Sequence, residues 1–307
     1  MKQSETKKNI IDIINHYSLS TNIPPQFIEK DIYVVKVLSV LSKINYPNVQ
    51  LVFSGGTCLS KAYGKIGRFS EDIDFCINTT VAFSRKEKSN FRKFIIAELN
   101  KSEDFSVIDN PITITDESNF FSFGIAYDRN FESSSNLRKN IKIEFKFENL
   151  IGQSNVREIT TLLHPYLNDE VVEFACINIQ EVLANKFSAL LWRSYIKDRT
   201  KPLYSKENDP TIMRHLYDIA TLETEIKTPF FKELVFKFYT KDCNRIGTQN
   251  NHSLCEFANI VLNKLKSDKI FKEEYVNFVD SMCYTQNRIS FKDALNSLTN
   301  LVNYISE

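Results

Sequence analysis

Glycine and proline are scarce in this chain, with 7 and 8 among its 307 residues. A pair of adjacent glycines is therefore more informative here than in a glycine-rich protein. The chain has 6 cysteines, but they form no Cys-x-x-Cys pair and no Cys/His cluster with the spacing of zinc ligands. This pattern excludes the usual structural zinc sites, and free thiols are typical of a reducing cytoplasm.

Long apolar runs are absent as well. No uninterrupted apolar stretch approaches the roughly 20 residues that a membrane-spanning helix needs, and residues 1–9 are polar, without the apolar segment of a signal peptide. The net charge of +1 neither supports nor excludes nucleic-acid binding, because a neutral protein can carry a local basic patch. We therefore expect a cytoplasmic protein with no membrane partner.

The apolar pattern divides the chain into two parts. Residues 1–175 combine helical and strand-like segments, whereas residues 176–307 are mostly helical in pattern. The length is sufficient for two compact domains. We predict an α+β domain that begins with N-terminal helices, followed by a helical C-terminal domain.

The individual segments support this division. Helices are predicted at 7–17, 25–41, 57–64 and 84–99, and the clearest strands at 49–54, 73–77, 120–127 and 141–147 within a strand-like stretch from 105 to 163. Later helices are predicted at 181–195, 210–222, 229–239, 254–265 and 291–305. Residues 199–209 are charged and contain a proline, which predicts an exposed loop.

A glycine turn follows the strand predicted at residues 49–54. Gly55 and Gly56 lack a Cβ atom, so the backbone can turn sharply there and approach a bulky ligand closely. Thr57 then begins a short helix, whose free N–H groups attract phosphate. Lys61, one helical turn later, provides a further cation. These residues predict a phosphate-binding turn.

Two aspartates follow on the next predicted strand. Asp72 and Asp74 are two residues apart, so they project from the same face, with Cα atoms roughly 6.5 to 7 Å apart. Two such carboxylates repel each other by about 4 kcal/mol at about 4 Å and an effective dielectric constant of about 20. A divalent cation offsets that cost, so the pair predicts a Mg²⁺ or Mn²⁺ site at which a nucleoside triphosphate (NTP) completes the coordination.

A third carboxylate commonly completes such a site from a neighbouring strand, and Glu144 is the best candidate metal ligand. Its segment alternates between apolar and charged residues, which places Lys142, Glu144 and Lys146 on one face. A solvated position on a half-exposed strand is the simpler alternative for Glu144. Taken singly, the Gly-Gly pair and the Asp-x-Asp pair are also usually just a turn and a strand end. Their combination at this separation favours a nucleotide site.

At these residues the chain resembles the abortive-infection AbiEii/AbiGii-type nucleotidyltransferase toxins, which belong to the DNA polymerase β-like superfamily. The first two motifs of that family are similar to Gly55-Gly56-Thr57-x-Leu59-x-Lys61 and Arg68-x-Ser70-x-Asp72-Ile73-Asp74. Glu29-Lys30-Asp31 resembles a segment often seen near the family's N-terminus. The resemblance covers roughly residues 25 to 225 and implies a polymerase-β-like domain with a mixed sheet.

The resemblance also implies roles for residues outside the aspartate pair. Lys186 corresponds to a lysine that faces the nucleotide, and Asp218 to the last acid of an Arg-Asp-x-x-Asp-like motif, in which this chain has His215 where an acid is common. We expect Lys186 to neutralise phosphate and Asp218 to orient it. A snorkelling surface lysine and a helix-surface acid remain the alternatives.

Arg68 and Ser70 complete the predicted nucleotide-binding residues. Arg68 has the geometry to clamp a phosphate through two hydrogen bonds, or to pair with Glu71. Ser70 is placed either to bond a phosphate or to cap the entry to the strand. The sequence does not separate these alternatives.

The function implied is transfer of a nucleoside monophosphate (NMP) from an NTP to a hydroxyl group, with release of pyrophosphate. The resemblance further implies a toxin of a toxin–antitoxin or phage-defence system, with a cognate antitoxin as partner and the 3′ end of tRNA as acceptor. Two alternatives remain open. One is an enzyme that nucleotidylates a protein hydroxyl, and the other is a catalytically silent nucleotide-binding module.

Overall fold

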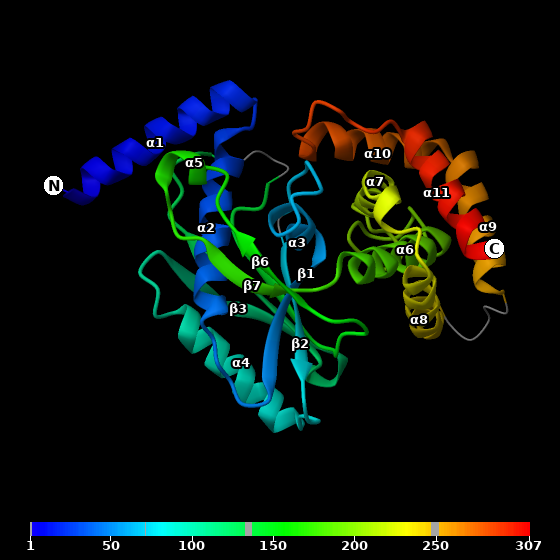
Figure 1. Cartoon of the computed structure of the whole chain (residues 1–307), viewed down its shortest axis with the longest axis horizontal. Helices are drawn as coiled ribbons and strands as arrows, with labels where there is room; N and C mark the ends of the chain where they lie inside the picture. Colours follow the sequence, from blue (N-terminus) through cyan, green and yellow to red (C-terminus); the bar gives the residue numbers. More distant parts are fainter. Residues whose placement is uncertain (1, 71, 133–136, 247–251) are drawn as a thin grey trace. The chain divides into compact units, whose positions relative to one another are not determined.

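The computed structural model describes residues 2–70, 72–132, 137–246 and 252–307, and its contacts divide the chain into two compact units. The first unit contains Met1–Gly64 and Phe69–Ile177, and the second contains Lys65–Arg68 and Asn178–Glu307. The sequence-based division had the segment Lys65–Arg68 in the first domain. An α+β first unit and a helical second unit confirm the predicted fold class (Figure 1).

The first unit is built on a seven-stranded mixed sheet with the strand order β3-β4-β5-β2-β1-β7-β6. The strands are β1 (Val49–Ser54), β2 (Asp72–Thr79), β3 (Phe105–Thr115), β4 (Phe120–Tyr127), β5 (Ile141–Phe147), β6 (Asn155–Ile159) and β7 (Val172–Cys176). Strand β2 pairs with β5 in parallel and with β1 in antiparallel orientation. The four strands singled out in the sequence are confirmed, whereas β7 was not predicted.

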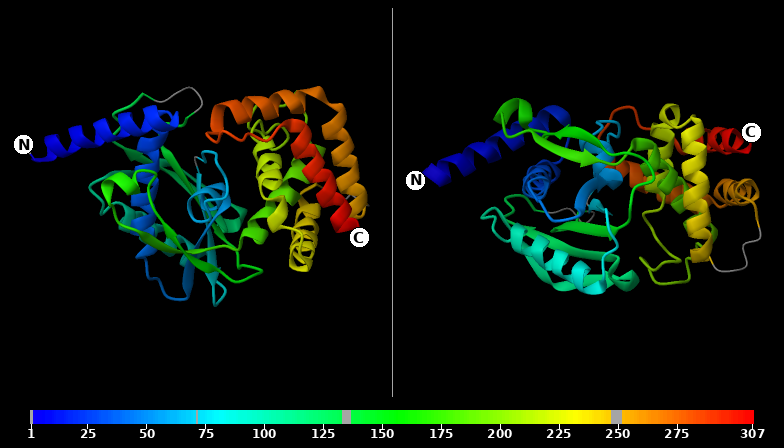
Figure 2. Two further views of the ribbon diagram at one scale, coloured as in Figure 1. Left: turned by 45° about the horizontal axis from the view of Figure 1, so that its top comes forward. Right: turned by 60° about the horizontal axis from the view of Figure 1, so that its bottom comes forward.

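Five helices of the first unit are described: α1 (Lys2–Thr21), α2 (Pro25–Ser42), α3 (Gly55–Lys61), α4 (Arg85–Leu99) and α5 (His164–Leu167). Helix α2 begins at a proline, which is tolerated there because its missing N–H would have no partner. Helix α4 begins with a capping box, in which Ser84 and Glu87 satisfy each other's backbone N–H groups. Helices α2 and α4 pack against each other and against the sheet (Figure 2).

A row of aromatic rings forms the centre of the first unit's core. Phe53, Phe75, Phe145 and Phe121 occupy matching positions on β1, β2, β5 and β4. Their neighbouring ring centroids lie 5.8, 5.2 and 4.7 Å apart along the row. All four side chains are buried. This row fixes the register of the four strands, because a shift by one residue would bring their polar neighbours into the core.

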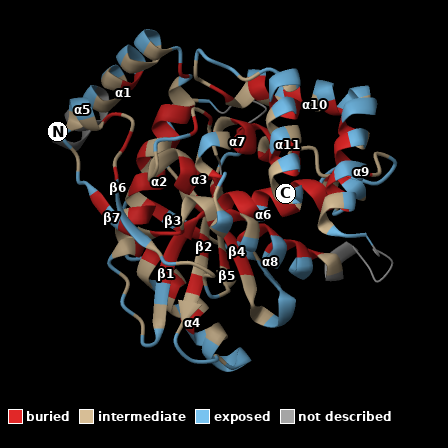
Figure 3. Ribbon diagram, turned by 45° about the vertical axis from the view of Figure 1, so that its right-hand side comes forward, coloured by how far each residue is buried: buried red, intermediate tan, exposed pale blue. Residues whose placement is uncertain are grey.

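The second unit consists of helices around an apolar centre (Figure 3). Its described helices are α6 (Ile179–Tyr195), α7 (Met213–Thr221), α8 (Pro229–Ile246), α9 (Leu254–Ser267), α10 (Lys269–Met282) and α11 (Phe291–Ser306). The helices predicted in this region are confirmed, and α10 is an addition. No helix in the described ranges combines the length and the apolar character that a membrane span requires.

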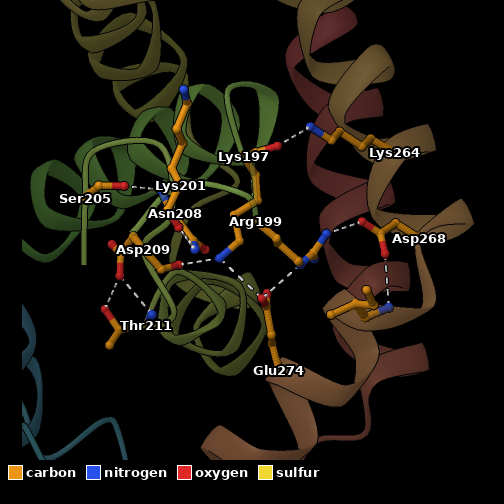
Figure 4. A network of polar contacts seen from close by, with 11 residues as sticks. Lys197, Arg199, Lys201, Ser205, Asn208, Asp209, Thr211, Lys264, Asp268 and Glu274 are labelled. Atoms are coloured by element: carbon orange, nitrogen blue, oxygen red, sulfur yellow. Dashed lines mark hydrogen bonds and ion pairs between the residues drawn. The ribbon is translucent and has the colours of Figure 1, made fainter. Parts of the chain in front are cut away.

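The predicted loop at residues 199–209 contains no helix or strand, but it is less exposed than expected. Arg199 donates to Asp268 at 2.6 Å and to Glu274 at 3.2 Å, both next to or on α10 (Figure 4). Asn208 is buried and donates to the carbonyl of Lys201 at 2.7 Å. The expectation of an exposed loop was therefore wrong for its two ends. At one end Arg199 pairs with residues at α10, which was not predicted, and at the other end Asp209 pairs with Arg193 of α6.

Candidate functional site

A polar row lies next to the aromatic row, on the opposite face of the same four strands. Ser54, Asp74, Glu144 and Ser122 are cross-strand partners on β1, β2, β5 and β4. Each directly neighbours one of the four phenylalanines in sequence, so its side chain leaves the other face of the sheet. The Ser54 hydroxyl donates to the carbonyl of Asp74 at 3.3 Å. The sheet thus aligns two of the three candidate metal ligands, Asp74 and Glu144, in one row.

The glycine turn and Asp74 are in direct contact. Gly55 has a φ of +75°, a conformation that residues with a side chain rarely adopt. A Cβ atom at this position would lie 1.8 Å from the carboxylate oxygen Oδ2 of Asp74. Glycine is therefore required at position 55 both by the backbone conformation and by the closeness of the carboxylate.

Thr57 connects the start of α3 to the strand that carries the aspartates. Its hydroxyl donates a hydrogen bond to the backbone carbonyl of Asp72, and its side chain is buried. Gly56, in the first turn of α3, is also buried. These contacts hold the glycine turn against β2, so the candidate phosphate-binding residues and Asp72 belong to one local structure.

Two basic side chains pair with two of the three candidate metal ligands, Asp72 and Glu144. Arg138 contacts Asp72, with 2.7 Å between Nη1 and Oδ1. Lys142 forms an ion pair with Glu144 from the same strand and the same face. Among the described residues no group of three or more acidic, histidine or cysteine side chains is gathered into a metal-binding cluster. The carboxylates provide the oxygen ligands that Mg²⁺ prefers, so the donor chemistry fits a divalent cation although two of them hold cationic side chains here.

Lys61 and Ser70 belong to the same unit but have other surroundings. Lys61 pairs with Asp31 at 2.6 Å, and both side chains are largely buried. Asp31 also accepts the backbone N–H of Leu162 at 2.7 Å, so this ion pair fastens α3 to α2. Ser70 is half-buried at the entry to β2. Nucleotide binding by these two residues stays a prediction.

Arg68, Lys186 and Asp218 form a separate cluster within the second unit. The guanidinium of Arg68 donates to both carboxylate oxygens of Asp218, each at 2.6 Å. The ammonium of Lys186 lies 2.9 Å from Oδ2 of the same carboxylate. Only 3%, 10% and 0% of these three side chains, in the order named, is exposed. Glu71, the alternative partner proposed for Arg68, lies outside the described residues.

Burial and charge act in opposite directions on this cluster. Burial by itself raises the pKa of Asp218, but Arg68 and Lys186 outweigh it and lower that pKa below its ordinary value. Burial lowers the pKa of Lys186, and Arg68 and Arg214 act in the same direction, against the raising effect of Asp218. Asp218 therefore holds the ammonium of Lys186 in a buried ion pair, and its role in orienting Lys186 toward a nucleotide stays a prediction.

His215 is buried beside this cluster. Burial lowers its pKa well below the ordinary value, and Lys186, Arg214 and Arg193 act in the same direction. Neither ring nitrogen has a hydrogen-bond partner among the described residues. These surroundings favour the neutral form of the ring.

Six residues named from the sequence lie together around the glycine turn: Gly55, Gly56, Thr57, Asp72, Asp74 and Glu144. Ser54, Ser122 and Arg138 were not predicted, and Lys142 was given no role. A position of Lys142 beside Glu144 could have been predicted, because the alternation of the strand places both side chains on the same face. Arg138 lies between strands, where no periodic pattern exists to indicate its position.

Comparisons with known proteins identify the family and the fold. The model of the family "Nucleotidyl transferase AbiEii toxin, Type IV TA system" matches residues 43–297. Among solved structures, MenT4, a nucleotidyltransferase toxin from Mycobacterium tuberculosis, has a similar fold with a TM-score of 0.57 and 16% identity, over 96% of this chain and 89% of MenT4.

A second structure, a STING-associated CdnE c-di-GMP synthase from Capnocytophaga granulosa, aligns with 13% identity over 100% of this chain and 91% of its own. Its TM-score of 0.28 is too low to indicate a shared fold. A comparison with curated proteins gives no match. The family match covers most of the chain and includes both the glycine turn and the aspartate strand. The chain therefore belongs to the AbiEii family of nucleotidyltransferase toxins, of type IV toxin–antitoxin systems.

Proposed function

We propose that this nucleotidyltransferase toxin transfers NMP from an NTP to a hydroxyl group at the glycine turn and polar row of the first unit. The observation that carries the proposal is the contact between Gly55 and the carboxylate of Asp74. A turn that admits a bulky ligand and a carboxylate suited to a divalent cation are adjacent there.

Each residue has a defined part in the proposed reaction. Asp72, Asp74 and Glu144 would hold Mg²⁺ or Mn²⁺, which supplies positive charge for the α-phosphate and the departing pyrophosphate. Gly55 and Gly56 let the backbone approach the triphosphate, and Thr57 keeps their turn against β2.

In the transfer itself, the acceptor oxygen forms a bond to the α-phosphorus and the bond to the β-phosphate oxygen breaks. The proton of the acceptor hydroxyl passes to a carboxylate of the polar row. Pyrophosphate leaves with the electron pair of the broken bond.

The acceptor we propose is RNA, specifically the 3′ end of tRNA, and the proposed regulator is the cognate antitoxin of the same system. The antitoxin rests on the family to which the chain belongs, and the tRNA acceptor on the resemblance described above. The cytoplasm, where NTP and tRNA are available, is the proposed location. Protein nucleotidylation uses the same site with a different hydroxyl, and the acceptor experiment below separates the two.

Lys186, Asp218 and Arg68 enter the proposal through their family motifs. Within the second unit Lys186 shares the carboxylate of Asp218 with Arg68, so these two cations and one acid carry a net positive charge. We propose that Lys186 neutralises phosphate charge, oriented by Asp218, and that Arg68, Lys61 and Ser70 bind the nucleotide. Lys186→Met tests the phosphate-neutralising role, which predicts a higher KM for NTP in the variant.

The test is incubation of the protein with each labelled NTP, Mg²⁺ and total RNA, followed by separation of RNA and protein. We expect label in the tRNA fraction and release of pyrophosphate, both abolished by the double substitution of Asp72 and Asp74 with Ala. Asp109→Asn, which alters an exposed carboxylate on β3, is the matched control and should leave labelling unchanged.

Three other outcomes are informative. Label in the protein fraction would mean that the acceptor is a protein hydroxyl and not RNA, with the catalytic site as proposed. Triphosphate binding without pyrophosphate release would indicate a silent module. Undiminished labelling by the double variant would defeat the assignment of the aspartates.

A further inference from the structure

Two of the three candidate metal ligands are paired with basic side chains that are substantially exposed. Arg138 contacts Asp72 with 45% of the Arg138 side chain exposed, and Lys142 contacts Glu144 with 37% of the Lys142 side chain exposed. The carboxylate partners are less exposed, at 16% and 26%. The acids are therefore the more buried partners in the sheet, whereas the cations lie on their solvent side and can be hydrated when they leave.

The register of the sheet places these charges in one small patch. On the parallel strands β2 and β5, Asp72 lies opposite Lys142 and Asp74 lies opposite Glu144. The four side chains share one face of the sheet, and Arg138 reaches that patch through Asp72. Three carboxylates and two cations leave a single net negative charge, so the cations offset most of the repulsion between the acids.

The backbone of Arg138 is held while its side chain remains exposed. The buried ammonium of Lys30 donates to the carbonyl of Arg138 at 3.1 Å. The neighbouring Leu137 is buried. Near the other end of the same interstrand segment, Glu29 accepts the backbone N–H of Asn130 at 2.7 Å. Glu29 and Lys30 on α2 thus fix both described ends of this segment, so the guanidinium turns about an anchored backbone.

We propose that Arg138 and Lys142 are exchangeable counter-ions of the active site, an inference that rests on the function proposed above. In the nucleotide-free protein they neutralise Asp72 and Glu144. When a divalent cation takes over those carboxylates, both basic side chains face like charge and pair instead with non-bridging oxygens of the triphosphate. Arg138 is the stronger ligand, because a guanidinium binds two phosphate oxygens at once.

The exchange makes a prediction that a purely structural ion pair does not make. Arg138 competes with the metal ion for the Asp72 carboxylate and then binds oxygens of the triphosphate. Removing its charge should therefore raise the affinity for the metal ion and lower the affinity for NTP. Arg138→Gln should bind Mn²⁺ alone about two- to fivefold more tightly, since a solvent-exposed pair is weak. It should bind Mn²⁺ with a non-hydrolysable NTP at least about tenfold more weakly.

The experiment measures Mn²⁺ binding by electron paramagnetic resonance and NTP binding by calorimetry on the full chain. Arg138→Lys keeps the charge and should leave Mn²⁺ affinity near that of the wild type while weakening NTP binding. Lys142→Gln should shift both affinities as Arg138→Gln does, by smaller factors. Lys139→Gln, which alters the exposed cation next to Arg138, is the control and should change neither.

Two results would overturn the exchange: equal weakening of Mn²⁺ and NTP binding by Arg138→Gln, or unchanged NTP binding in that variant. The proposed function fails in a different way. If Asp74→Asn binds Mn²⁺ and NTP as the wild type does, the site itself is misplaced, whatever Arg138 does.

Discussion

The two units each contain a cluster in which acidic side chains are paired with cations, and the clusters differ mainly in burial. In the second unit Asp218 has no exposed side-chain surface and is held by Arg68 and Lys186. In the first unit, Arg138 and Lys142 remain exposed on Asp72 and Glu144. Buried ion pairs are costly to break, whereas exposed pairs contribute little to stability and exchange partners readily. We therefore expect the buried cluster to contribute more to stability and the exposed ion pairs to exchange partners more readily.

The largest stability effect should come from the buried cluster. Asp218→Asn leaves the charges of Arg68 and Lys186 without their carboxylate in a buried place, which should cost about 3–5 kcal/mol of unfolding free energy. Urea denaturation measures this loss. Asp109→Asn on the exposed part of β3 is the control, with an expected change within about 0.5 kcal/mol. A loss below about 1 kcal/mol for Asp218→Asn would remove the distinction between the clusters.

The buried cluster should also produce a dependence of stability on acid pH. The pKa of Asp218 is lower in the folded protein than its ordinary value. Its contribution is therefore fully present above the unfolded pKa, about 3.9, and is lost as the pH falls through the lower folded pKa. The difference in unfolding free energy between wild type and Asp218→Asn should narrow below about pH 4. A constant difference down to pH 2 would contradict the lowered pKa.

Asp74→Asn should separate activity from stability in the first unit. We expect transfer to fall by about 10²- to 10³-fold, as when a group that stabilises charge in the transition state is removed. The unfolding free energy should change by less than about 1 kcal/mol, because Asp74 is not fully buried. Parallel rate and urea measurements test this. Loss of stability in proportion to activity would make Asp74 a structural residue.

The glycine turn provides a smaller effect with a matched control. Gly55→Ala introduces a Cβ atom at the position of the Asp74 carboxylate and at a φ of +75°, so it should reduce transfer and cost more stability than the roughly 1–2 kcal/mol of left-handed backbone strain alone. Gly64→Ala carries a similar strain at a φ of +60°, with no atom within 4 Å of the new Cβ among the described residues. It should cost stability alone. Equal activity of the two variants would show that the contact between Gly55 and Asp74 does not matter for transfer.

The smallest expected effect is the loss of stability in Arg138→Gln. Its exposed pair with Asp72 should contribute less than about 1 kcal/mol, whereas Arg68→Gln, in the buried cluster, should cost about 3–5 kcal/mol. Thermal or urea denaturation of the two variants side by side tests the comparison directly. Similar losses would show that the contribution of these ion pairs to stability does not depend on their exposure.

Local patterns predicted a large part of the fold. The apolar run at 49–54 and the alternation at 141–147 became β1 and β5, because each segment carries its own periodic signal. Helix α10 was missed although Phe271, Tyr275 and Val279, all buried, recur at the four-residue spacing of a helix face. That signal was present in the sequence and was overlooked.

The contacts that define the two clusters are of another kind. Asp74 meets Glu144 because β2 pairs with β5, and Arg68 meets Asp218 across 150 positions of sequence. Strand order and helix packing decide such contacts, and no local period reports them. Sequence patterns singled out the acids, but the pairing of Arg138 with Asp72 became visible only in the fold.

The central claim is that Asp72 and Asp74, beside the turn at Gly55, bind a metal-bound triphosphate. The most direct measurement is anomalous diffraction from crystals grown with Mn²⁺ and a non-hydrolysable NTP. The account predicts a manganese peak within coordination distance of both aspartates and phosphates against Gly55 and Gly56. A triphosphate bound elsewhere, with Asp74 still packed on Gly55 and no metal near it, would contradict the account.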